Sequence, residues 1–326
     1  MLLASSITPS GHSWALESAS RTLPDAPVIE LHAEASERER DVLETITEAL
    51  SITGAQSTSA DLIAGIGSLR DVAALVAAWE RQTASASRSI VSCRCSIADL
   101  ILDLHSLRLL AEVSGSSRTG RALADRLQTV MSALQSGAIE WLLAVAPQPD
   151  AWGVAKRQVA LASGAGVFIR GVVMAPMPRK RDGWPKVIRQ HAREVFHQAV
   201  VDLHPIAIAR TRKGNAPKFP EPGILARESS TVIDASGNRV LTFTVPGLSS
   251  YDPADVEVGT WSADTAYPTT HVVLQCLRRP VWLEVEPTLR RCRASDVVVA
   301  GDTIAVEFHA VDGQWPRQDG SGQEVS

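Results

Sequence analysis

The segment from Ala138 to Met174, AIEWLLAVAPQPDAWGVAKRQVALASGAGVFIRGVVM, decides the fold. It contains two continuous apolar runs, residues 138–145 and 167–174, which are typical of buried strands. Residues 151–163 lie between them and read as a helix that ends at the glycine-rich turn 164–166. A strand, a helix and a second strand in this order predict two parallel strands with a helix packed across them.

The alternation of helices and strands continues on both sides of this segment. Downstream, a helix is predicted for residues 185–200 and a strand for residues 201–208. Upstream, a capping box of Ser36 and Glu39 opens a helix that ends at Gly54. Further patterns predict helices at residues 68–83, 97–113 and 118–136, and a β-like segment at residues 89–95. The fold class expected is therefore α/β, with a helical N-terminal part and a central parallel-rich α/β sheet.

Beyond residue 222 the apolar period changes from that of helices to two, which predicts strands. Seven short strands with hairpin turns between them favour an antiparallel β-sandwich. They are expected at residues 229–234, 239–245, 255–260, 270–277, 281–285, 296–300 and 303–310. The N-terminus, residues 1–36, is expected to be extended or poorly ordered, and a helical and α/β domain is expected at residues 37–222. A β-sandwich at residues 223–314 and a loose tail at residues 315–326 should follow.

Composition excludes several classes of protein. The chain has 326 residues, 45% of them hydrophobic, and a net charge of −4, so it can bury sizeable cores. Mean hydropathy is +0.03, and no apolar run reaches the length of a membrane helix, so no membrane partner is expected. The N-terminal residues lack the basic and apolar regions of a secretory signal, and the four cysteines lack zinc-site spacing. We expect a cytoplasmic protein with free thiols.

Positive charge is concentrated between Arg179 and Lys218. This stretch contains ten basic and three acidic residues, a net charge of +7, so the rest of the chain has −11. Such a surface can bind an anionic small molecule or nucleic acid. The alternative is a solvated helix and loop. The candidate phosphate-binding residues are Arg179, Lys180, Arg181, Lys186, Arg210, Arg212 and Lys213.

Histidines and carboxylates form a second candidate site. His191, Glu194 and His197 lie on one predicted helix, where Glu194 is within one turn of both histidines. Asp202 and His204 point to one side of the predicted strand 201–208. The five residues together suggest a metal-dependent enzyme. The alternatives are a polar helix face and a hydrogen-bonded Asp–His pair in the core, since no partner motif accompanies them.

Residues from about 60 to 210 resemble the phospholipase-D-like effector domain of TrmB-type bacterial regulators. The resemblance rests on residues 61–67 with 69–79 and 89–93, and on residues 159–174, with 230–234 as a later strand. The enzymatic family's H-x-K-x₄-D motif is absent, so the resemblance implies ligand sensing and not hydrolysis. The regulators also bind DNA through a winged helix, but residues 69–79 are too apolar for a recognition helix.

The C-terminal part resembles a small-heat-shock, or α-crystallin, β-sandwich, as appended to arsenical-pump ATPases. The residues concerned are Val240–Gly247, which end in Pro-Gly, Arg278–Glu284 with Leu289–Arg291, and the hairpin Asp296–Phe308. The resemblance covers residues 238–312 and implies a protein–protein interaction module, used for a protein partner or for self-association.

These observations favour a non-catalytic bacterial regulatory or adaptor protein. Its α/β domain would bind a ligand or nucleic acid, and its sandwich would bind a protein. No cofactor and no resident metal is expected, because the chain lacks G-x-x-x-x-G-K-[ST], G-x-S-x-G and G-x-G-x-x-G in the required context. Two alternatives stay open: the metal-dependent enzyme and a structural or assembly component whose sandwich edges drive oligomerisation.

Overall fold

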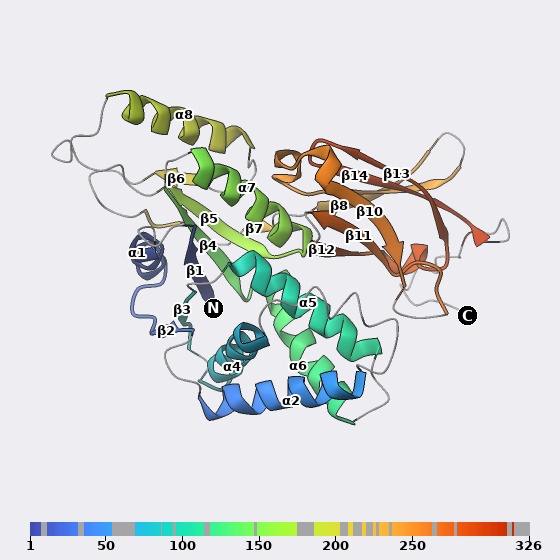
Figure 1. Cartoon of the computed structure of the whole chain (residues 1–326), viewed down its shortest axis with the longest axis horizontal. Helices are drawn as coiled ribbons and strands as arrows, with labels where there is room; N and C mark the ends of the chain where they lie inside the picture. Colours follow the sequence, from blue (N-terminus) through green and yellow to red (C-terminus); the bar gives the residue numbers. More distant parts are fainter. Residues whose placement is uncertain are drawn as a thin grey trace.

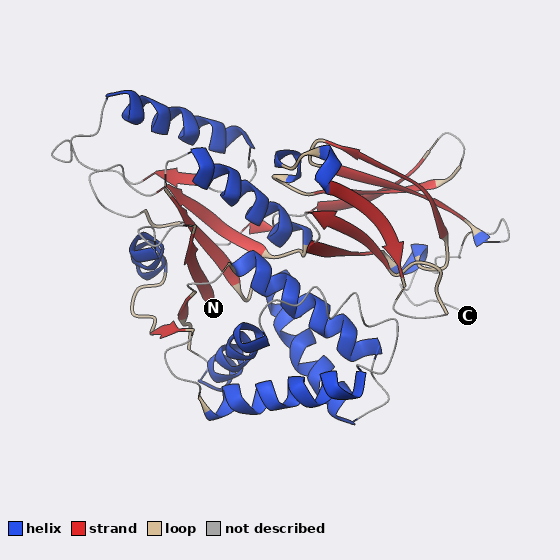
Figure 2. Cartoon of the chain, in the orientation of Figure 1, coloured by secondary structure: helices blue, strands red, loops and turns tan. Residues whose placement is uncertain are grey.

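The computed structural model describes residues 1–7, 12–31, 36–53, 69–85, 87–93, 96–113, 118–146, 149–174, 186–202, 208–210, 217–219, 224–225, 228–234, 237–262, 266–276, 279–311 and 315. An α/β part and a part built of antiparallel strands lie side by side (Figures 1 and 2). The expected class is confirmed: a helical N-terminal part, a central parallel sheet and a C-terminal antiparallel part.

In the described part of the chain the central sheet has six parallel strands in the order β2-β3-β1-β4-β5-β6, and the short strand β7 runs antiparallel to β5. The strands span Leu2–Ser6 (β1), Val28–Glu30 (β2), Ile90–Ser92 (β3), Glu140–Val145 (β4), Phe168–Met174 (β5), Ile208–Arg210 (β6) and Ile224–Leu225 (β7). The strands and helix expected between residues 138 and 174 are confirmed as β4, α7 and β5. The change from parallel to antiparallel sheet falls between β7 and the strand that begins at Glu228.

The N-terminal residues correct one expectation. Residues 1–36 were expected to be extended or poorly ordered, but β1 lies in the middle of the parallel sheet, between β3 and β4. Leu2, Leu3 and Ala4 are buried on alternate faces of the sheet, in two different core clusters. A run that is apolar on both faces is what a central parallel strand requires, because helices cover both of its faces.

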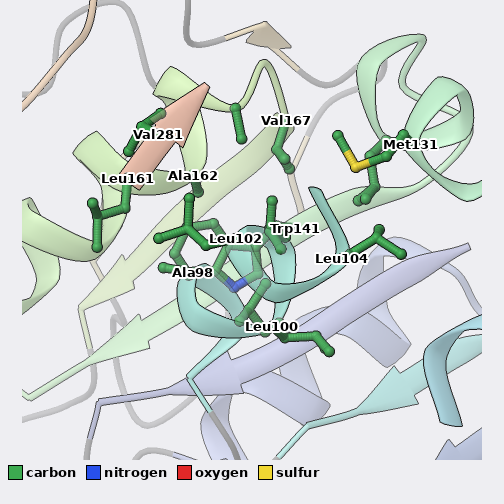
Figure 3. Packing of buried hydrophobic residues seen from close by; sticks show 14 of the residues in the cluster. Ala98, Leu100, Leu102, Leu104, Met131, Trp141, Leu161, Ala162, Val167 and Val281 are labelled. Atoms are coloured by element: carbon green, nitrogen blue, oxygen red, sulfur yellow. The ribbon is translucent and has the colours of Figure 1, made fainter. Parts of the chain in front are cut away.

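Helices cover the two faces of the sheet unequally. Helix α1 packs on one face together with Phe219, while α4, α5 and α7 contribute to the large core on the other face. Trp141 of β4 lies in this large core, among side chains of α5 and α7 (Figure 3). The helices span His12–Thr22 (α1), Glu37–Thr53 (α2), Leu69–Ser85 (α4), Ile97–Val113 (α5), Arg118–Gln135 (α6), Pro149–Gly164 (α7) and Lys186–Asp202 (α8).

The predicted start of helix α2 is confirmed, with the Ser36 half of the predicted capping box in place. The Ser36 hydroxyl oxygen accepts a hydrogen bond from the Glu39 backbone N–H at 3.1 Å, as an N-cap residue does. The predicted strand 201–208, in contrast, is wrong at its beginning. Val201 and Asp202 end helix α8, where the Gln198 amide donates to the Asp202 carboxylate at 2.7 Å, and the described strand β6 spans Ile208–Arg210. This i, i+4 bond extends the helix past two β-branched valines that favour a strand.

The C-terminal part consists of a three-stranded sheet, β10-β11-β12, and a four-stranded sheet, β13-β14-β9-β8. All seven predicted strands are present. The hairpins turn at Gly237 and Gly301, which have φ values of 84° and 59° in the left-handed region that favours glycine. The strands span Glu228–Ile233 (β8), Arg239–Thr244 (β9), Val256–Trp261 (β10), His271–Cys276 (β11), Arg279–Glu284 (β12), Arg293–Ala300 (β13) and Thr303–His309 (β14).

The two parts of the molecule share one hydrophobic core. The cluster that contains Trp141 and Leu102 of the α/β part also contains Val281 of β12 (Figure 3). A Cβ atom added to Gly164, at the end of α7, would lie 2.6 Å from Val281 Cγ1, so the helix and the strand are in close contact there. The sandwich is therefore packed firmly against α5 and α7.

Candidate functional site

The parallel sheet offers a binding region at the carboxyl ends of its strands. In the chain, β1 is followed by β2, which lies on one side of it, and its neighbour β4 is followed by β5, which lies on the other side. The direction of the chain therefore switches between β1 and β4. Open α/β sheets bind ligands outside the carboxyl ends of the strands at such a point. The structure describes the floor of this region, where the Ile7 N–H donates to Ala144 O at 3.1 Å and the Cys93 N–H donates to Ala4 O at 2.9 Å.

The predicted basic site is described only in part. Arg179, Lys180, Arg181, Arg212 and Lys213 lie outside the described residues, as does the side chain of Lys186 at the start of α8.

Arg210 ends β6, and its guanidinium carbon lies 5.9 Å from the centre of the Phe196 ring on α8. Strands β5 and β6 end at Met174 and Arg210, at the same carboxyl edge of the sheet. The candidate basic residues closely follow these two ends in the sequence.

The structure does not assemble the histidine and carboxylate site from the residues it describes. Asp202 belongs to α8 and not to a strand, and its carboxylate bonds to α7. Lys156 Nζ lies 3.1 Å and Trp152 Nε1 3.3 Å from Asp202 Oδ2. Asp202 therefore ties two helices together.

The two other described members of this predicted site lie on the outside of α8. Glu194 and His197 are exposed, and Glu194 accepts a hydrogen bond from Gln190 at 3.1 Å. The side chain of His191 and all of His204 lie outside the described residues. Within the described part of the chain, no three His, Cys, Asp or Glu side chains are grouped to hold a metal ion.

A cavity of about 430 Å³ opens at the other edge of the parallel sheet, where β2 and β3 begin. Residues 22–27 and 87–88 line it. Asp25 has a φ of 67°, an uncommon conformation for a residue other than glycine. Arg88 and Asp25 place opposite charges on its wall, so its lining does not favour one class of ligand.

The sandwich has an open edge beside an apolar groove. Within the described residues β13 pairs only with β14, so its other side is a strand edge, where the Val297 N–H donates to the Asp296 carboxylate at 2.9 Å. Val298 and Val299 on this strand are 53% and 41% exposed. The groove has a volume of about 220 Å³ and is lined by Leu248, Ser249, Tyr251, Pro253, Val256, Val299 and Gly301.

Hydrogen bonds hold the wall of this groove in place. The Asp302 carboxylate accepts from the backbone N–H groups of Gly247 and Ser249 at 3.1 and 2.8 Å. The Tyr251 hydroxyl donates to the Arg157 carbonyl oxygen of α7 at 3.2 Å. The groove is therefore preformed and attached to the α/β part. Sequence reasoning missed it, although three consecutive valines on a strand, Val297–Val299, indicate that at least one faces outward.

A second feature that sequence reasoning missed lies between the sandwich and α5. The rings of Trp261, His271 and Trp282 are in contact, with centres 5.0 to 6.2 Å apart, and His105 of α5 lies 6.4 Å from His271. Burial, together with smaller contributions from the nearby guanidinium groups of Arg108 and Arg290, lowers the pKa of His271 to about 3. His271 is therefore neutral near pH 7.

Comparisons with known proteins identify no family. No protein-family model matches the chain, and no curated protein is similar to it. The two resemblances drawn from the sequence, to phospholipase-D-like effector domains and to α-crystallin sandwiches, therefore stay predictions. No helix in the described part of the chain is long and apolar enough to cross a membrane.

Proposed function

We propose that the protein is a non-catalytic bacterial regulatory or adaptor protein. Its sandwich captures an extended segment of a partner protein along β13, and its α/β part binds an anionic ligand at the carboxyl edge of the parallel sheet. The observation that supports the proposal most strongly is the open edge of β13 beside a preformed apolar groove.

The chemistry of the edge selects an extended partner. The outward N–H and C=O groups of β13 are satisfied best by another strand, which is how sheet edges bind peptides. The groove lies beside Val299 and has an apolar lining. Its volume suits a small number of aliphatic side chains. In a strand every second side chain faces the same way. The preferred segment is therefore one that alternates aliphatic and polar residues.

Binding of such a segment tests the proposal. The probe is a fluorescein-labelled octapeptide that alternates valine with threonine or lysine, and its control has prolines at two central positions. Val299→Lys places a charge at the mouth of the groove. Burying one valine side chain contributes about 1.5–3 kcal/mol, so we expect fluorescence polarisation to show affinity at least about tenfold weaker.

Val232→Lys is the matched control, because Val232 is an exposed valine on β8, the opposite edge strand of the same sheet. It should bind the octapeptide as the unaltered protein does. Equal affinity for the proline peptide, or full affinity in Val299→Lys, would contradict the proposal. Concentration-dependent self-association that Val299→Lys abolishes, measured by sedimentation without peptide, would show that the partner is a second copy and would favour the assembly role.

The anionic site has a separate test. The triple substitution of Arg179, Lys180 and Arg181 by alanine should weaken the binding of short DNA or RNA in a mobility-shift experiment. Binding should also become less sensitive to salt, because each lost phosphate contact lowers the slope of log K against log salt by about 0.9 for a duplex. Unchanged mobility, or no binding by the unaltered protein at low salt, would exclude nucleic acid as the ligand.

A further inference from the structure

Three strands of the sandwich bring aromatic side chains to one place opposite α5. Trp261 ends β10, His271 begins β11 and Trp282 lies in β12, and Trp261 and His271 are paired in register. Trp282 packs with Leu109 and Leu110 of α5 in a small buried cluster. The C-terminal half of α5 therefore docks on the three-stranded sheet through this cluster, close to His271.

His271 is surrounded by groups that favour its neutral form. Only 4% of the residue is exposed, and its Nδ1 lies 2.9 Å from the Thr270 hydroxyl. Its Nε2 is buried and has no hydrogen-bond partner among the described residues, and the same holds for Trp282 Nε1. A proton on Nε2 would therefore add a charge that no described group in this contact stabilises, and burial makes such a charge costly.

Arginines on both sides of the contact between α5 and the three-stranded sheet further disfavour a protonated His271. On α5, Arg108 Nη2 lies 3.4 Å from His105 Nε2, and Arg108 Nη1 lies 2.9 Å from the Glu112 carboxylate. On the sandwich, Arg290 lies 2.8 Å from Glu284, which is paired with His271 across β11 and β12.

Acid makes the net charge of this contact more positive. Burial raises the pKa of Glu112, against the opposing effect of Arg108, so falling pH neutralises this carboxylate early. The contact then holds two arginines and, once His271 is protonated, a third positive charge, with fewer carboxylates to offset them.

We propose that acidification opens the contact between α5 and the three-stranded sheet through protonation of His271. His271 is thus an acid-sensitive latch between the α/β part and the sandwich. Through α5, the latch connects the proposed ligand-binding sheet to the proposed peptide-binding sandwich, although its test requires neither binding activity.

The direction of the pH dependence follows from the two states. In the closed state His271 resists protonation down to about pH 3, whereas in the open state its pKa has the ordinary value of about 6.5. The closed state is fully favoured above pH 6.5. As the pH falls below 6.5, the ratio of open to closed molecules rises about fivefold in the first unit, then approaches about tenfold per unit, and levels off near pH 3.

Hydrogen exchange followed by mass spectrometry tests the latch in the full chain. The protection of the C-terminal half of α5 and of β11 should decrease about fivefold between pH 6.5 and 5.5, after correction for the intrinsic pH dependence of exchange. Protection of β4, in the middle of the parallel sheet, should be unchanged. In His271→Phe and His271→Gln, this decrease should be absent.

Two histidine variants serve as controls. His309→Gln removes an exposed histidine of the same sandwich and should behave as the unaltered protein. His105→Gln should retain the transition. The proposal is overturned if the His271 variants open as the unaltered protein does, if His105→Gln alone abolishes the transition, or if β4 loses protection together with α5.

Discussion

Helices α5 and α8 are both seventeen residues long, and the tripeptide Asp-Leu-His is associated with each of them. In α5 the tripeptide is Asp103–His105, and all three residues are buried. In α8 it begins at the last residue, Asp202, whose carboxylate is held by Lys156 of the neighbouring helix. The aspartates of the two motifs thus have different environments, and packing decides which of them applies.

The reason lies in the residues around each motif. Helix α5 is apolar around nearly its whole circumference, as a helix buried on all sides must be, and it lies among α4, α6, α7 and β12. Helix α8 buries Val195 and Ala199 but leaves Val200 and Val201 exposed. Removing a side chain from α5 should therefore affect the whole protein, whereas the same change in α8 should not.

The largest expected effect comes from truncating an aliphatic side chain in α5. Leu102 lies in the large core beside α7 and β12 (Figure 3), so Leu102→Ala leaves a cavity and should lower the free energy of unfolding by about 2–5 kcal/mol. Val201→Ala is the comparison in α8, where 74% of the residue is exposed, and it should change stability by less than about 0.5 kcal/mol. Urea unfolding measures both. If the two variants lost similar amounts of unfolding free energy, the claim that α5 is buried on all sides and α8 is not would be contradicted.

A smaller effect is expected within α7, where two glycines have different surroundings. Gly164→Ala brings a Cβ atom within 2.6 Å of Val281, so the sandwich must shift, at a cost of about 1–3 kcal/mol. Gly153→Ala meets only the end of the Arg157 side chain at 3.8 Å and should stabilise the helix by about 0.5–1 kcal/mol. Thermal unfolding should therefore shift in opposite directions. If Gly164→Ala were also stabilising, the close contact between α7 and β12 would be wrong.

Much of the fold could be predicted because its elements repeat a clear period. The helix that contains Leu102, the strands on either side of α7 and all seven sandwich strands follow from periodicity and turns. Strand β1 was missed because five residues are too short to show a period, and its burial depends on β3 and β4, which come much later in the chain. The end of α8 was missed because Val200 and Val201 favour a strand, while the hydrogen bond from Gln198 to Asp202 extends the helix past them and Lys156 of α7 holds the same carboxylate.

The candidate sites were harder to predict because they depend on contacts between distant segments. The groove beside Val299 combines a hairpin with the turns around Tyr251 and Pro253, which lie about fifty residues earlier. His271 is one residue of an ordinary predicted strand, and only the docking of α5 makes it a buried histidine between two arginines. Asp202 was placed on a strand for the same reason, since its contacts with Lys156 and Trp152 of α7 join segments about fifty residues apart.

Hydrogen exchange of β13 in the presence of the alternating octapeptide tests the central claim most directly. If a peptide strand adds to the sandwich at this edge, the backbone amides of residues 293–300 should exchange more slowly when the peptide is bound. Those of residues 228–233 in β8, the other edge of the same sheet, should be unaffected. Protection of β8 in place of β13, or no change at either edge at a saturating peptide concentration, would contradict the account.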